Sequence, residues 1–189
     1  MTRMLIMGPP GSGKGTQAAR IAERFSIPAI STGDIFRANV SASTPLGVEV
    51  KRYLDAGQYV PDSVTNDMVR ERLSEPDVAD GFLLDGYPRT VAQVEFLDAV
   101  LAEHGVALDR VIELVVDIEE VVARLLKRAQ DEGREDDSED VIRHRQKLYG
   151  EQTAPLIQIY RERGLHVAVD GKGTVDEVAD RVAAAVPAP

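Results

Sequence analysis

The stretch MGPPGSGKGTQ, residues 7–17, places four glycines, two prolines and one lysine within eleven positions. It follows a short apolar run, RMLIM (3–7), and leads into KGTQAARIAERF (14–25), whose pattern predicts a helix. A glycine-rich loop between a strand and a helix lets backbone N–H groups converge on an anion, and the helix N-terminus adds partial positive charge. The residues predicted to contact a nucleoside triphosphate are Pro10, Gly11, Ser12, Gly13, Lys14, Gly15 and Thr16.

The loop departs at one position from the pattern G-x4-G-K-[ST]. Gly8 to Lys14 match, but Gly15 follows the lysine and the hydroxyl comes at Thr16. Lys14 is placed to reach the β and γ phosphates, whereas the usual direct contact between a hydroxyl and Mg²⁺ is not assigned. The alternative is an ordinary glycine-rich turn, which the flanking strand and helix disfavour.

Composition narrows the class of protein. The 189 residues fit one domain, and the chain has no cysteine, which excludes disulfides and thiolate metal sites. No apolar stretch approaches the roughly 20 residues of a membrane helix, and the N-terminal apolar run, unlike a signal peptide, breaks at Gly8. We expect a cytoplasmic protein. The net charge of −10 predicts no nucleic-acid partner, so positive charge for a phosphate must be gathered locally.

The hydrophobic pattern predicts an α/β fold with a parallel sheet of five strands and helices on both faces, in three layers. The expected strands are 3–7, 28–32, 81–85, 110–117 and 166–170, and the expected helices are 14–25, 62–74, 90–103, 119–132, 138–162 and 174–185. Residues 33–60 predict short helices inserted between two strands. The tract DEGREDDSED (131–140) is polar and acidic, as expected of a solvated loop.

A second motif, DGYPRTVAQ (85–93), follows a predicted buried strand. Open α/β sheets bind ligands at the carboxyl ends of their strands. A buried carboxylate at Asp85 needs a cation, for which Mg²⁺, held through water, is the natural partner. Gly86 permits close backbone approach, and Arg89 follows a proline that stiffens the loop for a grip on phosphate. Gln93 offers a donor and an acceptor to an adenine edge. A surface loop with an incidental arginine is the alternative.

The C-terminal arginines differ in their helical neighbours. Arg143 follows Glu139 by four residues, which predicts a surface ion pair. Arg145 lies on a largely apolar face, so it should point inward and needs an anion that its own helix does not provide. Arg124 and Arg128 are one helical turn apart. As an alternative to an anion, Glu120 could pair with Arg124, and Glu132 with Arg128.

Three motifs in order, GPPGSGKGT, STGDIFR (31–37) and DGYPRT (85–90), together resemble the adenylate kinase family, and the resemblance runs from residue 3 to about 185. It implies a single P-loop domain with a core (1–30, 61–126, 138–189), an inserted AMP-binding region (31–60) and a short lid (127–137). Nine residues separate Arg124 from Arg134, which implies the short lid and, without cysteine, no zinc. The resemblance also implies a monomer that uses Mg²⁺ with ATP.

Carried over by position, the resemblance assigns three sets of residues. For ATP it adds Arg124, Arg128 and Gly173 to the glycine loop. For AMP it assigns Thr32, Arg37, Gln58, Tyr59, Val60, Gly86, Tyr87, Pro88, Arg89, Gln93, Arg134 and Arg145. The catalytic set is Lys14, Arg89, Arg124, Arg128, Arg134 and Arg145. Without the resemblance, Ser31, Thr32 and Asp34 would indicate only the N-cap of a helix. Likewise, GQYVPD (57–62) would indicate only a turn before a helix.

The reaction implied is MgATP + AMP ⇌ 2 ADP, so the partners are the small nucleotides ATP, AMP and ADP, and no membrane. The attacking phosphate is already an anion, and no histidine or cysteine is needed as a base; His104, His144 and His166 are scattered along the chain. A UMP/CMP kinase of the same fold is one alternative, which Thr32 and Gln93 disfavour. A regulatory GTPase would need the motif N-K-x-D, which the sequence lacks. A silent nucleotide-binding module would not need so many arginines.

Overall fold

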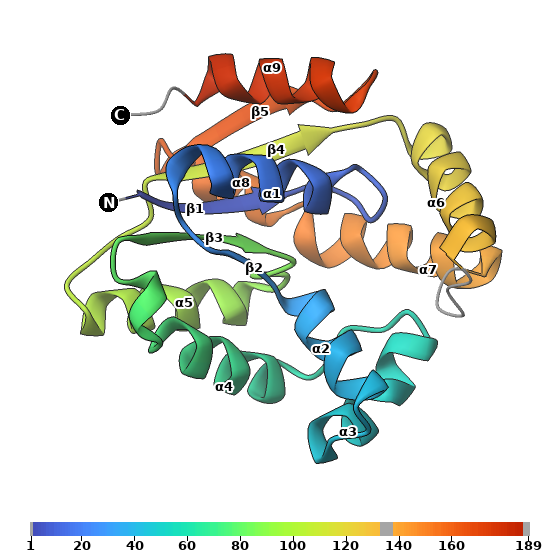
Figure 1. Ribbon diagram of the computed structural model, residues 1–189, viewed down its shortest axis with the longest axis horizontal. Helices are drawn as coiled ribbons and strands as arrows, with labels where there is room; N and C mark the ends of the chain where they lie inside the picture. The colour runs from blue at the N-terminus through green and yellow to red at the C-terminus, as the bar shows by residue number, and fades with distance from the viewer. Residues whose placement is uncertain (1, 133–137, 187–189) are drawn as a thin grey trace.

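A computed structural model describes residues 2–132 and 138–186 of the chain. Five strands form one sheet in the order β2-β3-β1-β4-β5, and every neighbouring pair is parallel. The strands are β1 (Thr2–Met7), β2 (Ala29–Ser31), β3 (Gly81–Asp85), β4 (Arg110–Val115) and β5 (His166–Asp170). The predicted five-stranded parallel sheet is confirmed (Figure 1).

Alternation along the buried central strand divides the core into two layers. Met4 and Ile6 pack in one apolar cluster, and Leu5 and Met7 point to the opposite face, as the period of two in a strand requires. The first cluster includes residues of α1 (Lys14–Phe25) and α9 (Val175–Ala185). The second includes residues of α4 (Asp62–Leu73), α5 (Val91–Glu103) and α8 (Leu156–Glu162). Helices therefore cover both faces of the sheet, in the three layers predicted.

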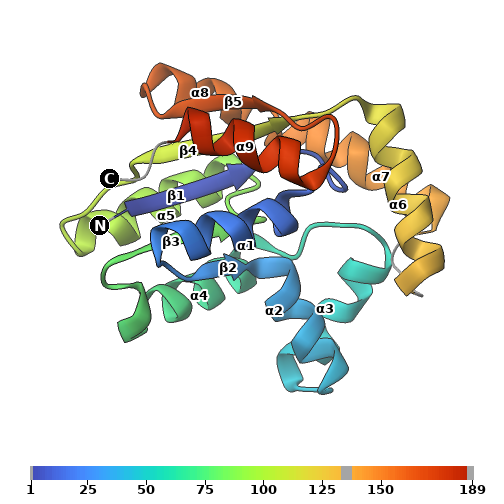
Figure 2. The ribbon, with the colours of Figure 1, turned by 45° about the horizontal axis from the view of Figure 1, so that its top comes forward.

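Two short helices, α2 (Thr32–Ser41) and α3 (Pro45–Asp55), project from the sheet as a separate lobe (Figure 2). They have a small apolar cluster of their own, centred on Phe36, Val50 and Val60. The predicted insertion of short helices is therefore confirmed. The helices α6 (Ile118–Glu132) and α7 (Glu139–Leu148) pack together beyond the carboxyl ends of the strands. The 3-10 turn Pro76–Val78 precedes β3. The division into core, AMP-binding region and lid stays a prediction.

One predicted element is wrong. The sequence pattern predicts a continuous helix over 138–162, whereas the structure has α7, a π-helical turn at Tyr149–Thr153, and α8. Pro155 has no N–H to donate, so the α-helical ladder cannot continue through it. The N–H of Ala154 donates instead to the carbonyl of Tyr149, five residues back, at 2.8 Å. Thr153, in this wider turn, donates a hydrogen bond to the carbonyl of Arg89 and lines the candidate site.

The topology fixes where that site lies. The central strand β1 leads into α1 on one face, and its neighbour β3 leads into α5 on the other. Adjacent strands whose connections diverge in this way open a crevice at their carboxyl ends. The glycine loop and the segment from Asp85 to Thr90 lie at this crevice. Within residues 2–132 and 138–186, the structure contains no helix of a length and apolarity that would let it span a membrane.

Candidate active site

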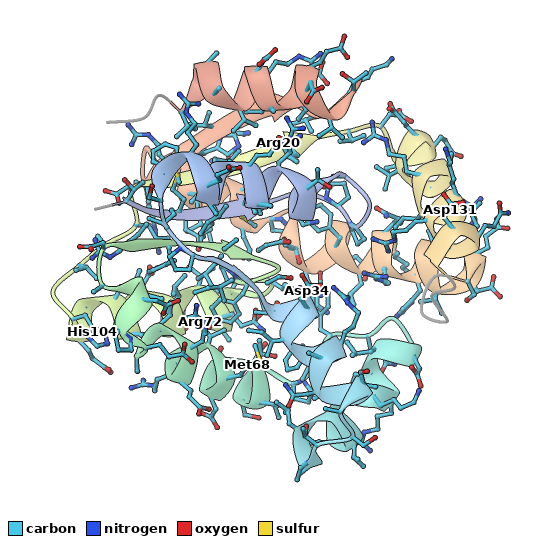
Figure 3. The ribbon with its side chains drawn as sticks, viewed as in Figure 1. Arg20, Asp34, Met68, Arg72, His104 and Asp131 are labelled. Atoms are coloured by element: carbon cyan, nitrogen blue, oxygen red, sulfur yellow. The ribbon has the colours of Figure 1, made fainter. Side chains whose placement is uncertain are left out.

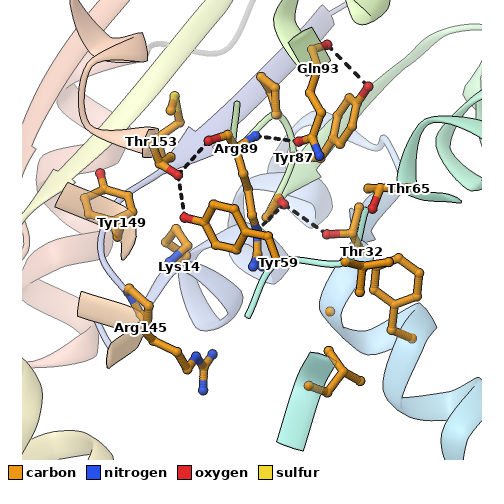
Figure 4. Close-up of a pocket in the computed structure, with 18 of the residues that line it drawn as sticks. Lys14, Thr32, Tyr59, Thr65, Tyr87, Arg89, Gln93, Arg145, Tyr149 and Thr153 are labelled. Carbon is orange, nitrogen blue, oxygen red and sulfur yellow. Dashed lines mark hydrogen bonds between the residues drawn. The ribbon is translucent and has the colours of Figure 1, made fainter. Parts of the chain in front are cut away.

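A pocket opens at the carboxyl edge of the sheet, between the glycine loop, the first turn of α2, the segment before α4 and the π-helical turn (Figure 4). Most of the residues predicted for AMP line it together, although they come from distant parts of the sequence. The predicted residues in its lining are Pro10, Lys14, Thr32, Arg37, Gln58, Tyr59, Val60, Gly86, Tyr87, Pro88, Arg89, Gln93 and Arg145.

The glycine loop has the backbone that a phosphate cradle requires. Gly11 has a φ of +84°, and a Cβ there would lie 2.6 Å from Cγ of Leu125 on α6, so only glycine fits. Gly13 precedes α1 in a left-handed conformation, and no described side chain caps the N-terminus of that helix. The first N–H groups of α1 therefore remain available to an anion.

Lys14 reaches back over this loop, and its Nζ donates to the carbonyls of Gly8 at 2.8 Å and Pro9 at 3.1 Å. Desolvation by burial lowers the pKa of Lys14 to about 8, and the positive charges of Arg89, Arg145 and Arg128 act in the same direction. The negative charge of Asp85 opposes this shift. Several cations from different elements are thus close enough to repel one another, as expected where an anion is to be bound.

Asp85 is the last residue of β3, and only 9% of its surface is exposed to solvent. Burial raises the pKa of its carboxyl, while Lys14, Arg89 and Arg37 oppose that rise. A Cβ on Gly15 would lie 3.9 Å from Oδ2 of Asp85, so the carboxylate faces the start of α1. No group of three metal-binding side chains occurs among the described residues. A lone carboxylate fits Mg²⁺, which usually takes one or two carboxylates and completes its shell with water and substrate phosphates.

The start of α2 holds two predicted AMP residues. The hydroxyl of Ser31 accepts a hydrogen bond from the N–H of Asp34 at 3.2 Å and caps the helix. Thr32 is 2% exposed, and its hydroxyl donates to the carbonyl of Gly86 at 3.1 Å. Arg37 pairs with Asp34 at 2.6 Å. Asp34 lies where α2 leaves the sheet (Figure 3), so it holds Arg37 beside the pocket.

Arg89 is held along its length. Its Nε donates to the carbonyl of Gly86 at 2.7 Å, and its guanidinium lies over the ring of Tyr59, 5.1 Å from the ring centre. A Cβ on Gly86, which has a φ of +81°, would lie 3.0 Å from Nη2 of Arg89. Glycine at position 86 therefore allows the guanidinium to lie against the backbone.

The remaining predicted arginines divide into different environments. Arg143 pairs with Glu139 at 3.0 Å, as predicted. Arg145 lies in the pocket lining, and its Cγ would be 2.9 Å from a Cβ on Gly57. Arg124 pairs with Glu120 at 2.5 Å and also donates to the carbonyl of Gly171 at 3.3 Å.

Other assigned residues are not in the lining of this pocket: Gly11, Ser12, Gly13, Gly15, Thr16, Asp85, Arg124, Arg128 and Gly173. Arg128 is near enough to Lys14 to affect its pKa. Gly173 has a φ of +106° immediately before the N-cap of α9, Thr174. Arg134 lies outside the described residues, as do the neighbouring acidic residues of the predicted lid.

Sequence reasoning missed four polar residues at this site. Thr153 and Thr65 line the pocket, Asp62 contacts Gln93, and Gln146 donates to the carbonyl of Pro10 at 2.8 Å. For Asp62 the available signal was its place at the start of a helix beside the GQYVPD segment. The histidines lie elsewhere: His104 is at the outer end of α5 (Figure 3), His144 is exposed, and His166 pairs with Glu113 at 2.7 Å.

The sheet topology, the glycine loop with its lysine, and the cations around the crevice define a P-loop nucleotide-binding protein of the phosphoryl-transfer class. A family model described as "Adenylate kinase" matches residues 6–165. The chain belongs to the adenylate kinase family, whose members are nucleoside monophosphate kinases.

Curated relatives match this chain over almost its whole length. The chain is 64% identical to an adenylate kinase of Kocuria rhizophila over 186 residues, covering 98% of this chain and 99% of the relative. It is 68% identical to one of Nocardioides sp. over 180 residues, 95% of this chain and 94% of the relative. It is 63% identical to one of Pseudarthrobacter chlorophenolicus over 188 residues, 100% of this chain and 98% of the relative.

Proposed function

We propose that this enzyme transfers the γ-phosphoryl group of MgATP to AMP and releases two molecules of ADP. The observation that supports this most directly is the meeting of Lys14, Arg89 and Arg145 at one pocket, from three different elements. A single triphosphate would be served by the glycine loop and its lysine. The further arginines suit a second phosphate, brought in line with the first.

In this proposal AMP occupies the lined pocket. Its base lies among Thr32, Gln93 and the segment Gln58–Val60, and its phosphate meets Arg37, Arg89 and Arg145. The apolar and aromatic surface of Val60 and Tyr59 supplies contact area for a base, and the buried polar groups orient it. Arg134, in the predicted lid, is proposed to contact the transferred phosphate.

ATP is proposed to bind on the other side of the cations, with its phosphates along the glycine loop from Pro10 to Thr16. Arg124 and Arg128 of α6 are proposed to hold these phosphates, and the backbone at Gly173 is proposed to contact the adenine. The hydrogen bond from Arg124 to the carbonyl of Gly171 supports this placement, because it joins α6 to the loop that holds Gly173.

Asp85 is proposed to hold Mg²⁺ through water. When bound, the ion neutralises charge on the β- and γ-phosphates. Burial raises the pKa of the Asp85 carboxyl, and the positive charges of Lys14 and Arg89 act in the opposite direction, toward its ionised form. In that form Asp85 is an acceptor that a hydrated cation can use.

Catalysis then consists of positioning and charge neutralisation, which is the usual basis of phosphoryl transfer. The phosphate of AMP needs no general base. Arg89 is pre-oriented by Gly86 and Tyr59, so little of its freedom is lost on binding. Water would compete with AMP, so closure of the proposed AMP-binding region (31–60) and lid (127–137) is expected to exclude it. We propose a cytoplasmic monomer that acts on small nucleotides.

A panel of acceptors tests the proposal. The enzyme is incubated with MgATP and AMP, GMP, CMP or UMP in turn, and the nucleoside diphosphate formed is measured. Preference for AMP is the expected result. Preference for CMP or UMP would instead assign the enzyme to pyrimidine nucleotides, and hydrolysis of ATP without an acceptor would contradict the exclusion of water.

A further inference from the structure

Asp62, the first residue of α4, joins the beginnings of two helices at the rim of the pocket. Its Oδ1 accepts a hydrogen bond from Nε2 of Gln93 at 2.7 Å. Both carboxylate oxygens also face the hydroxyl of Thr90, at 3.1 and 3.2 Å. Thr90 is the N-cap of α5 and accepts from the N–H of Gln93 at 3.3 Å. Asp62 thus acts on Gln93 both directly and through the helix cap.

The amide of Gln93 is held at both ends. Its Oε1 accepts from the backbone N–H of Arg89 at 2.7 Å, and its Nε2 donates to Asp62. A backbone N–H only donates and a carboxylate only accepts, so exchanging the amide oxygen and nitrogen would break both hydrogen bonds. Because Gln93 is 1% exposed, water cannot easily replace them. One amide hydrogen and one lone pair of Oε1 remain for a ligand.

We propose that Asp62 is a positioning residue that fixes the orientation of the Gln93 amide and thereby selects adenine over a 6-oxopurine. The inference rests on the proposed placement of the AMP base beside Gln93. Adenine presents an acceptor at N1 and a donor at its 6-amino group, whereas a 6-oxopurine presents a donor at N1 and an acceptor at O6. An amide of fixed orientation matches only one of these edges at a given place.

Thr32, on α2, also presents lone pairs of fixed direction to the pocket. Its hydroxyl proton is directed to the carbonyl of Gly86, so the oxygen offers only lone pairs to a ligand. Lone pairs suit an amino group and oppose a carbonyl oxygen. Two buried groups on different elements, α2 and α5, are therefore both oriented by hydrogen bonds that do not involve the ligand.

The test compares AMP with IMP, which differs from AMP only by the 6-oxo group and the proton on N1. The measured quantity is the selectivity ratio, which is the inhibition constant of IMP against AMP divided by the KM for AMP. This ratio does not depend on how much of a variant is folded, so partial misfolding cannot imitate or hide the effect. Asp62→Asn keeps the size of the side chain but can donate as well as accept, so reversal of the Gln93 amide would then break only the hydrogen bond from the Arg89 N–H.

Asp62→Asn is expected to lower the selectivity ratio about tenfold, the effect of losing a hydrogen bond to a charged group. The KM for ATP should change less than about twofold. Asp67→Asn, an exposed aspartate on the same helix, is the matched control and should leave both unchanged. Thr90→Val keeps the direct contact between Asp62 and Gln93, so its ratio should stay near that of the wild type.

Two failures would be distinguishable. A selectivity ratio for Asp62→Asn within twofold of the wild type, together with a large loss of AMP affinity in Gln93→Ala, would overturn the role of Asp62 alone. If Gln93→Ala also left the KM for AMP and the ratio unchanged, the proposed placement of the base would be wrong.

Discussion

The hydroxyl of Tyr59 donates a hydrogen bond to Oγ1 of Thr153, with the two oxygens 2.5 Å apart. The direction follows from Thr153, whose single hydroxyl proton is given to the carbonyl of Arg89 at 2.8 Å. Tyr59 also lies beneath the guanidinium of Arg89. Two consecutive hydrogen bonds beside the pocket therefore join the segment after α3, the π-helical turn and the loop that carries Arg89.

Tyr59→Phe tests these two hydrogen bonds, because it removes the Tyr59 hydroxyl and keeps the ring under Arg89. The free energy of unfolding should fall by about 1 kcal/mol, the usual effect of one hydrogen bond, and the KM for AMP should rise several-fold. Tyr53→Phe is the control, since the Tyr53 hydroxyl accepts from the exposed Arg52. Chemical denaturation and steady-state kinetics measure the two effects. If both variants had the same free energy of unfolding and the same KM for AMP, the Tyr59–Thr153 hydrogen bond would have no role at the site.

Arg89→Ala should lower kcat/KM for AMP by about 10² or more, comparable to the loss of one donor to a transition-state anion. The reason is that Arg89 is pre-oriented toward the pocket by the carbonyl of Gly86. Arg143→Ala, which removes a surface cation paired with Glu139, should change the rate little. Circular dichroism confirms that both variants fold. Near-normal turnover by Arg89→Ala would remove this residue from the site.

The lowered pKa of Lys14 predicts that ATP binding weakens in alkaline solution. Because this pKa is about 8 in the free enzyme, Lys14 loses its charge as the pH rises above that value. Bound phosphates favour the charged form, so binding should take up protons at such pH. Calorimetry in two buffers of different ionisation enthalpy measures that uptake. An ATP affinity that stays constant to pH 9.5 would contradict the shift.

The same shift has a defined sign for stability. Between about pH 8 and the ordinary value of 10.5, the unfolded chain keeps the Lys14 proton and the folded chain has lost it. The free energy of unfolding therefore rises with pH through this window, as far as Lys14 contributes.

Asp85→Asn should shift the alkaline loss of activity to lower pH. The Asp85 charge raises the pKa of Lys14 against the effect of burial, so removing that charge lets the pKa fall below about 8. The variant should also need more Mg²⁺ for half-maximal rate. Asp98→Asn, whose carboxylate pairs with Arg163 at the surface, is the control and should leave the profile in place. A pH profile of Asp85→Asn that overlays the wild type would contradict the coupling.

The features of the fold and site that could be predicted from the sequence are those set by local patterns. The apolar strands, the glycine loop and the pairing of Arg143 with Glu139 depend on neighbours within a few residues, and the structure has them as expected. Arg145 was predicted to face inward from its neighbours at three and four positions, and it lines the pocket. Contacts between distant segments were not predictable. Thr153 and Arg89 are 64 residues apart and Gln146 and Pro10 are 136 apart, so no periodicity connects them.

The break after α7 shows the same limit at the level of an element. Gly150 and Pro155 were visible in a pattern that otherwise continued to residue 162. The missing N–H of Pro155 interrupts the helix, but the contacts that Thr153 makes with Arg89 and Tyr59 exist only in the folded chain. Functional polar residues often occur at such turns.

The central claim is that scattered cations meet between two nucleotides in one site. A crystal structure with two adenosines joined by a chain of five phosphates tests it most directly. The account predicts one adenosine in the pocket beside Gln93 and Thr32, with Lys14, Arg37, Arg89 and Arg145 against the phosphates. The claim would be contradicted if those arginines pointed into bulk solvent and the phosphates were held elsewhere.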